Sequence, residues 1–346
     1  MARIFICGDT GQATLLDSVS SALRDKGHDV VRGPLNEVGV VRTYSEVERH
    51  ALIDTSDIAV FTTRHACSRV LLEGARRLRG VCYPVIGVET IDLDAANELG
   101  IIVGHGAVRG NVIGMAESTI MLILMLLYDV ETNIGRLRNG QWRRPRHSSR
   151  QLEGKTIGLL GYGRIAKEIS VRLHSFGVRI IVTSPRTRAE NLPPGVEQVE
   201  LSRLFAESDV LCVLTGLTPQ TRHLIGFSEL GLMKPDAYLV NTARGEIIEE
   251  EALYACLDEG RIAGAALDTF AIEPLPSDSP LRTLSNVILT PHCVGHTIEG
   301  EAEFAPTMLE NIQRILAGEL PLYCKNPEAE PAWRRRLAHL DVENAT

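Results

Sequence analysis

The sequence contains no excess of positive charge and no long hydrophobic run. Its 346 residues include 36 Lys and Arg against 44 Asp and Glu, a formal net charge of −8. Nucleic acids and anionic membrane surfaces are bound through basic patches, so we expect neither as the main partner. The longest apolar run, from Thr119 to Tyr128, is too short to cross a bilayer and predicts a buried helix in a soluble protein.

Cysteine is sparse as well, and no two cysteines form a Cys-x-x-Cys pair. The seven residues are scattered, and their odd number argues against a disulfide framework. The first residues, ARIFICGD, are typical of a strand and lack a signal-peptide pattern, so we expect a cytoplasmic protein with reduced thiols. Cys293 follows His292 directly, but neighbours on an extended chain point to opposite faces, which disfavours a Cys–His nucleophile. The sequence has no metal-ligand motif such as HExxH, so no metal site is predicted.

Short apolar segments alternate with helix-like stretches along most of the chain. Apolar residues make up 44% and charged residues 23%, which is typical of a globular protein. In residues 1–105 the alternation begins with RIFICGD and ATLLDSVSSALRDKG, and a more regular series begins at Lys155 with KTIGLLGYG. Strand–helix alternation predicts parallel sheets covered by helices, and the length fits about two α/β domains. The second series matches a doubly wound nucleotide-binding domain.

The segments outside these two series predict helices and a loop. A long helix is expected from Gly114 to Gly140, followed by a polar, basic connection at 141–154. A single amphipathic helix is expected at 306–321, with no sheet of its own.

A glycine-rich turn lies between the strand KTIGLLGYG and the helix RIAKEISVRLHSFG. Gly161 permits the tight turn, Gly163 lets backbone N–H groups approach a pyrophosphate, and Ala166 still allows the helix to pack closely on the strand. The helix N-terminus, with Arg164 and Ile165, then faces the anion with its partial positive charge. The turn, with its strand and helix, predicts a dinucleotide site.

The ribose-binding position of this site carries no carboxylate. NAD-binding proteins place Asp or Glu about 20 residues beyond the turn, but the second strand here ends VTSPRTR, with Ser184 at its end. An acidic side chain would repel the extra phosphate of NADP, whereas a hydroxyl beside Arg186 and Arg188 could bind it. We therefore expect NADP or NAD as cofactor, with NADP favoured; two solvated loop arginines are the alternative interpretation.

Motifs further along the chain resemble one enzyme family. They are GYGRIA, LTPQTRHLI, LMKPDAYLVNTARGEIIEEEAL, GAALDTFAIEPL and LTPHCVGHT, in the family's order and spacing. Over about residues 75–325 the sequence resembles the D-isomer-specific 2-hydroxyacid dehydrogenases. The resemblance implies two doubly wound, Rossmann-like α/β domains with a cleft between them. It places a substrate domain at 1–113, completed by 305–346, and an inserted NAD(P)-binding domain at 114–304.

The resemblance also implies roles for individual residues. Arg244 of NTARG would bind the substrate carboxylate and carbonyl, His292 of TPH would be the acid/base, and Glu273 of AIEP would pair with it. The residues expected to contact the cofactor beyond the phosphate turn are Thr221, Thr242 and Asp268, the last at the nicotinamide end.

The chemistry fits these residue types. Reduction of a 2-keto acid adds hydride to the carbonyl carbon while the oxygen gains a proton, so the site needs a positioned acid. Histidine titrates in the required range, and a neighbouring carboxylate raises a histidine pKa and fixes its tautomer. Arginine binds a carboxylate in a bidentate fork and polarises the carbonyl. Each residue alone could be structural, but the shared order of the motifs favours the catalytic interpretation.

The substrate loop departs from the family pattern. Members usually carry an Arg-x-Gly-x-Gly loop that holds the substrate carboxylate through backbone N–H groups, whereas this chain has YPVIGVE. Tyr83 and Val85 replace the Arg and the first Gly, and Pro84 has no N–H to donate. Gly87 matches the second Gly, so Ile86 and Gly87 are the expected substrate-binding residues.

The leading hypothesis is a D-2-hydroxyacid dehydrogenase that works mainly as a 2-keto acid reductase, similar to glyoxylate/hydroxypyruvate reductases or phosphoglycerate dehydrogenases. The alternative is a dinucleotide-sensing binding protein of the corepressor type, because such proteins can retain the same Arg–Glu–His set. L-lactate and L-malate dehydrogenases are disfavoured because their phosphate turn opens the chain, and formate dehydrogenases because they place Gln beside the histidine. The sequence does not decide which side chain the substrate carries.

The family joins its subunits through the region that corresponds to 118–150 here, which predicts a homodimer.

Overall fold

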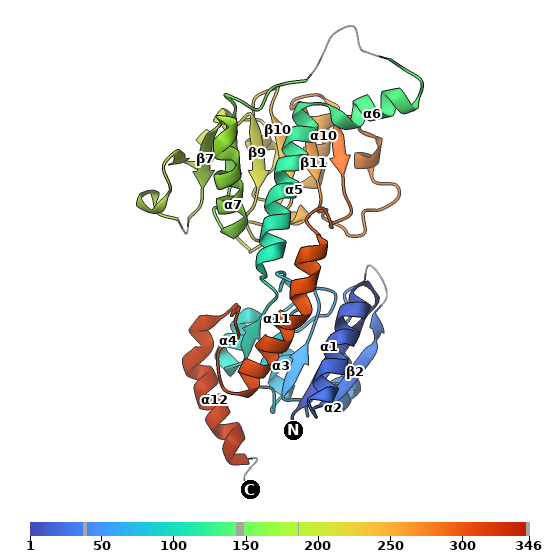
Figure 1. The fold of residues 1–346 in the computed structure, drawn as a ribbon, viewed down its shortest axis with the longest axis vertical. Helices are drawn as coiled ribbons and strands as arrows, with labels where there is room; N and C mark the ends of the chain where they lie inside the picture. Colours follow the sequence, from blue (N-terminus) through green and yellow to red (C-terminus); the bar gives the residue numbers. More distant parts are fainter. Residues whose placement is uncertain (37–39, 143–148, 186, 344–346) are drawn as a thin grey trace. The chain divides into compact units, whose positions relative to one another are not determined.

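The computed structural model describes residues 1–36, 40–142, 149–185 and 187–343. The described chain divides into two compact units (Figure 1). The first unit comprises Met1–Gly110 and Ile298–Thr346, and the second unit is Asn111–Thr297, which lies between these segments along the chain. The predicted domain boundaries at 113/114 and 304/305 lie a few residues further along the chain than these unit boundaries.

The first unit is built on a parallel sheet. In the residues described, its strand order is β2-β1-β3-β4-β5. The strands are β1 (Arg3–Asp9), β2 (Asp29–Asn36), β3 (Ile58–Val60), β4 (Gly80–Cys82) and β5 (Ile102–Gly104). The helices are α1 (Ala13–Asp25), α2 (Glu46–Leu52), α3 (Arg69–Gly74), α4 (Leu93–Leu99), α11 (Ile298–Leu316) and α12 (Glu330–Glu343), with short 3-10 turns at η1 (Thr10–Gln12) and η6 (Pro327–Ala329). Neighbouring strands are parallel, so their carboxyl ends meet at one edge.

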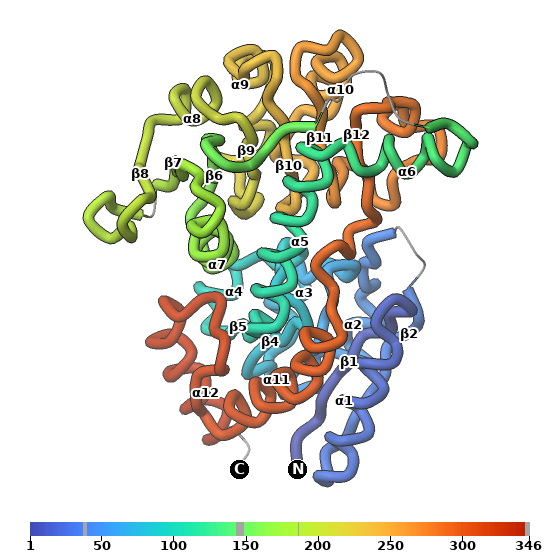
Figure 2. The backbone as a smooth tube through the Cα atoms, turned by 45° about the horizontal axis from the view of Figure 1, so that its top comes forward, coloured from blue at the N-terminus to red at the C-terminus, as the bar shows by residue number. Residues whose placement is uncertain are grey.

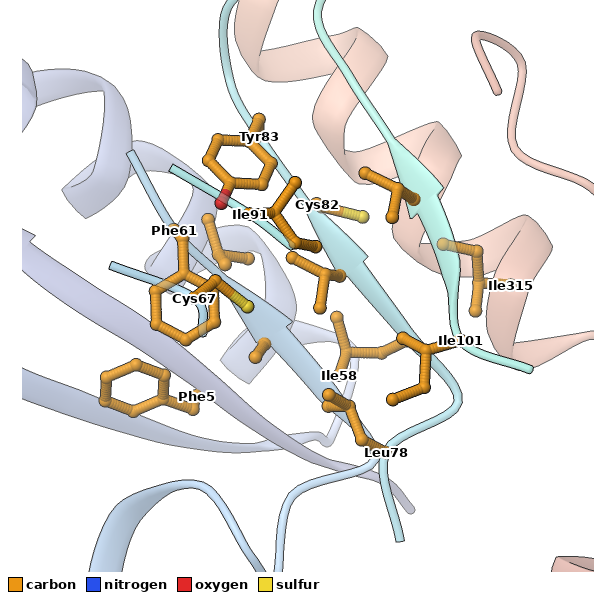
Figure 3. Packing of buried hydrophobic residues seen from close by; sticks show 14 of the residues in the cluster. Phe5, Ile58, Phe61, Cys67, Leu78, Cys82, Tyr83, Ile91, Ile101 and Ile315 are labelled. Atoms are coloured by element: carbon orange, nitrogen blue, oxygen red, sulfur yellow. The ribbon is translucent and has the colours of Figure 1, made fainter. Parts of the chain in front are cut away.

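An apolar core surrounds this sheet (Figure 3). The rings of Phe5 and Phe61 have centroids 5.7 Å apart. Tyr83 is fully buried in the same cluster, with its hydroxyl 3.3 Å from Thr90 Oγ1. Helix α1 packs beside α11, and α4 packs beside α12 (Figure 2). The tyrosine that replaces the family's usual arginine therefore serves the packing of the core.

The second unit contains the larger sheet. In the part of this unit that the structure describes, seven parallel strands run in the order β12-β11-β10-β9-β6-β7-β8. They are β6 (Thr156–Leu160), β7 (Arg179–Thr183), β8 (Val196–Gln198), β9 (Val210–Val213), β10 (Tyr238–Asn241), β11 (Gly264–Leu267) and β12 (Val287–Leu289). The order reverses at β6, and sheets of this type bind ligands outside the carboxyl ends of the strands at such a switch point.

Helices cover both faces of the second sheet (Figure 1). Helices α5 (Arg109–Leu127) and α7 (Arg164–Leu173) share one apolar cluster with the sheet, whereas α8 (Leu201–Glu207), α9 (Phe227–Leu230) and α10 (Glu250–Asp258) share another. The remaining elements are α6 (Val130–Arg138) and the 3-10 turns η2 (His174–Phe176), η3 (Ala189–Asn191), η4 (Gly245–Ile247) and η5 (Pro280–Thr283). Parallel sheets with helices on their faces confirm the predicted α/β class.

The long helix predicted from Gly114 to Gly140 is wrong in two respects. Helix α5 begins earlier, at Arg109, and ends at Leu127, and α6 starts at Val130. Asp129 between them has a left-handed backbone with φ of 51°, a conformation that Asp adopts more readily than most residues. Apolar periodicity continues across this one residue, so the pattern did not reveal the break.

The C-terminal helix also differs from the prediction. Helix α11 begins at Ile298 and runs through Pro306, where the sequence pattern had placed its start. Proline is favoured in the first turn of a helix, which is why the sequence predicts a helix that starts at Pro306. A second C-terminal helix, α12, was not predicted.

Among the helices that the structure describes, α5 is long and apolar enough to cross a membrane. The most apolar stretch of 18 residues in this helix is 56% buried inside the protein. This burial agrees with the expectation of a core helix.

Trp333 anchors α12 to the first unit. Its ring is fully buried, and its Nε1–H donates to the Arg79 carbonyl at 2.8 Å. We expect Trp333→Ala to lower the free energy of unfolding by about 3–5 kcal/mol, because an aromatic ring is removed from a packed core. Denaturant unfolding followed by circular dichroism measures this, with Val342→Ala as the control because Val342 lies exposed on the same helix. Equal stability of the two variants would contradict the anchoring role.

Candidate active site

Polar side chains follow three neighbouring strands of the second sheet. Arg244 follows β10, Asp268 follows β11 and His292 follows β12, with Glu273 in the loop beyond Asp268. Because β10, β11 and β12 are adjacent and parallel, their carboxyl ends meet at one edge. The structure therefore gathers these four predicted residues at one edge of the second unit.

His292 and Glu273 are in direct contact. His292 Nδ1 lies 2.7 Å from Glu273 Oε2. Since an ionised carboxylate can only accept, Nδ1 carries the proton of this hydrogen bond, which leaves Nε2 for another partner. The other carboxylate oxygen, Oε1, accepts the Phe270 amide at 3.0 Å, so both oxygens of Glu273 are held.

The surroundings of Glu273 favour its charged form. Burial alone would raise the pKa of this carboxyl, but hydrogen bonds from His292 and the Phe270 amide, with the positive charges of His292 and Arg244, hold the pKa below its ordinary value. Glu273 is thus ionised at neutral pH and presents a negative charge to the imidazole.

Arg244 stands on a tightly built turn. The buried Asn241 side chain accepts the Ala243 amide at 3.0 Å and donates to the Arg244 carbonyl at 3.0 Å. Gly245 follows, and a Cβ there would lie 1.9 Å from the Phe270 carbonyl carbon. Only glycine permits this approach, which brings the turn of Arg244 against the loop that leads to Glu273.

Asp268 is buried and faces the loop of His292. Its Oδ1 accepts hydrogen bonds from Thr290 Oγ1 at 2.7 Å, from the Cys293 amide at 3.1 Å and from the Val294 amide at 3.2 Å. Burial raises the pKa of the Asp268 carboxyl, and these donors oppose the shift without cancelling it. Its contacts within the protein are thus to the loop of the acid/base candidate.

The phosphate turn is shaped to hold a dinucleotide. Gly161 has φ of 99°, and a Cβ there would lie 2.9 Å from the Thr215 amide nitrogen, so the position requires glycine. A Cβ on Gly163 would meet nothing within 4 Å, which leaves room above the turn. Arg164 and Ile165 open α7, and within the described residues no side chain caps this helix, so its first amides can face an anion. Among the described residues, no group of three or more His, Cys, Asp or Glu side chains is placed to hold a metal ion.

The predicted ribose position lies in a tight turn after β7. Ser184 is buried, and its Oγ accepts a hydrogen bond from Thr187 Oγ1 at 3.2 Å. The Arg188 side chain is 81% exposed and lies 3.6 Å from Glu190. Arg186 lies outside the described residues. No acidic side chain therefore occupies the end of β7 at position 184.

The two predicted threonines make hydrogen bonds within the second unit. Thr221 Oγ1 donates to the Gly216 carbonyl at 2.7 Å and accepts the Thr218 amide at 2.7 Å. Thr242 Oγ1 lies 3.2 Å from Thr119 Oγ1 of α5. The hydroxyls of both residues thus have partners inside the second unit.

The predicted substrate loop belongs to the first unit, after β4. The Ile86 carbonyl lies 3.0 Å from His105 Nδ1, which fixes the loop against the residue after β5. The amides of Ile86 and Gly87 have no hydrogen-bond partner in the parts of the chain that the structure describes. Two neighbouring amides without partners can both donate hydrogen bonds to an anion that lies between them.

Three residues that were not predicted as site residues shape the site, namely Asn241, Gly245 and Thr290. Each lies within one of the motifs that resemble the family. Asn241 and Thr290 could have been found by asking which side chains next to the candidate Arg and His can hydrogen-bond a turn. The role of Gly245 depends on a contact between distant loops, which no local pattern reveals.

Comparison with known proteins relates the chain to one family. Residues 120–294 match the family model described as "D-isomer specific 2-hydroxyacid dehydrogenase, NAD binding domain". The chain is 37% identical over 309 residues to a D-3-phosphoglycerate dehydrogenase of Methanocaldococcus jannaschii, a match that covers 87% of this chain and 58% of that protein. It is 38% identical over 266 residues to a glyoxylate reductase of Thermofilum pendens, covering 75% of this chain and 78% of that protein.

A solved structure shares the fold. The crystal structure of a glyoxylate reductase from Paecilomyes thermophila matches with a TM-score of 0.82 and 28% identity, and the match covers 94% of this chain and 98% of that chain. The family model spans the phosphate turn, Arg244, Glu273 and His292. This chain belongs to the D-isomer-specific 2-hydroxyacid dehydrogenase family.

Proposed function

We propose that the protein is an NAD(P)-dependent D-2-hydroxyacid dehydrogenase that works mainly as a reductase of small 2-keto acids such as glyoxylate or hydroxypyruvate. The observation that carries this proposal is the 2.7 Å contact between His292 Nδ1 and Glu273 Oε2, at the strand edge that also bears Arg244. Two relatives are a glyoxylate reductase and a D-3-phosphoglycerate dehydrogenase, which supports the same substrate class.

His292 would move the proton. Its Nδ1–H is committed to Glu273, so Nε2 is the atom that exchanges a proton with the substrate oxygen. In reduction the imidazolium donates from Nε2 to the carbonyl oxygen, and in oxidation the neutral ring takes the proton back. The Glu273 carboxylate stabilises the imidazolium and holds the ring in one orientation.

Arg244 would bind the substrate carboxylate. A guanidinium can take a carboxylate through two parallel hydrogen bonds and polarise the neighbouring carbonyl. Ile86 and Gly87 of the first unit are also proposed as substrate-binding residues, because their amides have no partner among the described residues and can donate to an anion. Binding the carboxylate fixes the orientation of the carbonyl that accepts the proton.

The phosphate turn would hold the dinucleotide, which supplies or accepts the hydride when it is bound. The uncapped amides at the start of α7 would bind the pyrophosphate, and Ser184 lies where the ribose of the adenosine is expected.

A panel of 2-keto acids assayed with NADH and NADPH tests this proposal. Glyoxylate, hydroxypyruvate and 3-phosphohydroxypyruvate are compared at matched concentrations by following the absorbance of the reduced dinucleotide. We expect turnover with at least one small keto acid. Binding of the dinucleotide without turnover of any of them would identify a dinucleotide-sensing protein instead.

Replacing the proposed acid should remove most activity. We expect His292→Ala to lower kcat by about two to four orders of magnitude, the range for loss of a positioned acid or base. Dinucleotide affinity, measured by fluorescence titration, should stay near the wild-type value. Near-normal turnover of His292→Ala across the pH range would contradict the assignment.

The partner variant Glu273→Gln tests the carboxylate. Its negative charge faces the ring that donates the proton, so we expect loss of this charge to lower kcat for keto-acid reduction about tenfold or more while dinucleotide affinity stays near the wild-type value. Wild-type kcat in Glu273→Gln would show that the charge of Glu273 does not act on His292.

We further propose that the ribose pocket accepts both dinucleotides and favours NADP. Ser184→Asp should shift the kcat/KM ratio towards NADH by about tenfold or more, because an added carboxylate repels the phosphate of NADP and binds both ribose hydroxyls. Ser175→Asp is the matched control, since Ser175 is exposed on η2. A strong preference of the wild type for NADH at low salt would contradict this proposal.

A homodimer formed through 118–150 is also proposed. Five large apolar side chains between residues 118 and 150 are exposed, namely Met121, Tyr128, Ile134, Leu137 and Trp142. Exposed apolar side chains are covered when a subunit interface forms. We expect a dimer by light scattering at micromolar concentration and a monomer for the double variant Ile134→Glu/Leu137→Glu. Leu232→Glu, at another exposed apolar position, should stay dimeric. A monomeric wild type would overturn the proposal.

A further inference from the structure

One carboxylate oxygen organises the loop that carries His292. The three hydrogen bonds to Asp268 Oδ1 come from Thr290 on one side of His292 and from Cys293 and Val294 on the other. Asp268 itself is buried at the end of β11, so the oxygen is a fixed point. The loop is therefore clamped on both sides of the histidine.

The histidine needs such a clamp because its backbone is unfavourable. His292 has φ of 54°, in the left-handed region that residues with a Cβ rarely adopt. Its amide donates to the Thr290 carbonyl at 3.0 Å, which closes a narrow turn across Pro291. A conformation of this kind persists only where the surrounding contacts enforce it.

Thr290 contributes to the clamp in a way that substitution can isolate. In the described part of the chain, it is the only donor to Asp268 Oδ1 that uses a side chain, since Cys293 and Val294 donate through their amides. The second oxygen, Oδ2, has a 3.4 Å contact with the Val294 amide and retains capacity for another donor. Because the Thr290 hydroxyl bonds to Oδ1, we expect its loss to loosen the loop while Oδ2 keeps its contact with the Val294 amide.

We propose that Thr290 is a positioning residue for His292. Its hydroxyl, acting through Asp268 Oδ1, holds the imidazole in reach of Glu273 Oε2 and holds Nε2 towards the substrate oxygen. This inference rests on the proposed function of His292 as acid/base. Thr290 itself contacts neither the substrate nor the dinucleotide in this assignment, so its loss affects the proton transfer step.

The variants Thr290→Val and Thr290→Ser test the proposal. Valine keeps the shape and removes the hydroxyl, whereas serine keeps the hydroxyl. We expect Thr290→Val to lower kcat about ten- to hundredfold, the scale for a lost hydrogen bond to a charged group and a misplaced catalytic group. Dinucleotide affinity should change less than about twofold, and Thr290→Ser should recover most of kcat. The matched control is Thr283→Val, whose exposed hydroxyl donates to the Pro280 carbonyl at 2.7 Å.

A readout in the free protein separates this inference from the proposed function. Protein labelled with 15N in the histidine rings is studied by NMR, and the His292 Nδ1–H signal is assigned as the one missing in His292→Gln. We expect this downfield proton signal to move upfield or broaden in Thr290→Val, because the hydrogen bond from Nδ1 to Glu273 Oε2 is loosened. The signal should stay unchanged in Thr283→Val.

Wild-type kcat and an unchanged His292 Nδ1–H signal in Thr290→Val would overturn the positioning role. A loss of kcat that Thr290→Ser does not restore, with a matching fall in unfolding midpoint or dinucleotide affinity, would also overturn it and assign Thr290 to stability alone. A changed His292 Nδ1–H signal in Thr290→Val, together with a wild-type protein that turns over no keto acid, would support the positioning role while refuting the proposed function.

Discussion

The parallel pairing of β10, β11 and β12 brings the ends of three strands to one edge of the second sheet. Arg244, Asp268 and His292 each follow one of these strands, and Glu273 lies in the loop after Asp268. Residues far apart in the sequence thereby come within reach of one another, and side-chain contacts such as that between His292 and Glu273 then join them. The register of three short strands is the constraint on which the geometry of the site depends, and the loops add the finer positioning.

Much of this arrangement could be predicted from the sequence, because it follows from local patterns. Strand–helix alternation, the turn at Gly161 and the motifs that follow predicted the α/β class and the family, both of which are confirmed. The break at Asp129 could not be predicted, since one left-handed residue leaves no trace in apolar periodicity. The contact of Gly245 with Phe270 joins two separate loops, and no local pattern carries that information.

Two carboxylates at the same strand edge have pKa values shifted in opposite directions, and their different partners explain this. The pKa of Glu273 is lowered because charged partners, His292 and Arg244, outweigh its burial. The pKa of Asp268 is raised because it is more deeply buried and most of its donors are neutral. Environments of this kind can separate the roles of two chemically similar groups. Glu273 provides charge to the histidine, whereas Asp268 provides a fixed point for its loop.

The predicted substrate loop of the first unit shows how a departure from the family pattern is accommodated. The Pro84 carbonyl packs so closely against Gly106 that a Cβ there would lie 1.8 Å away, and the Gly106 amide donates to the Val85 carbonyl at 3.0 Å. The N–H that Pro84 lacks would fall within this packed segment. The amides of Ile86 and Gly87, which follow it, have no partner among the described residues. Pro84 therefore stiffens the base of the loop, and the amides of Ile86 and Gly87 further along the loop are left to donate to an anion.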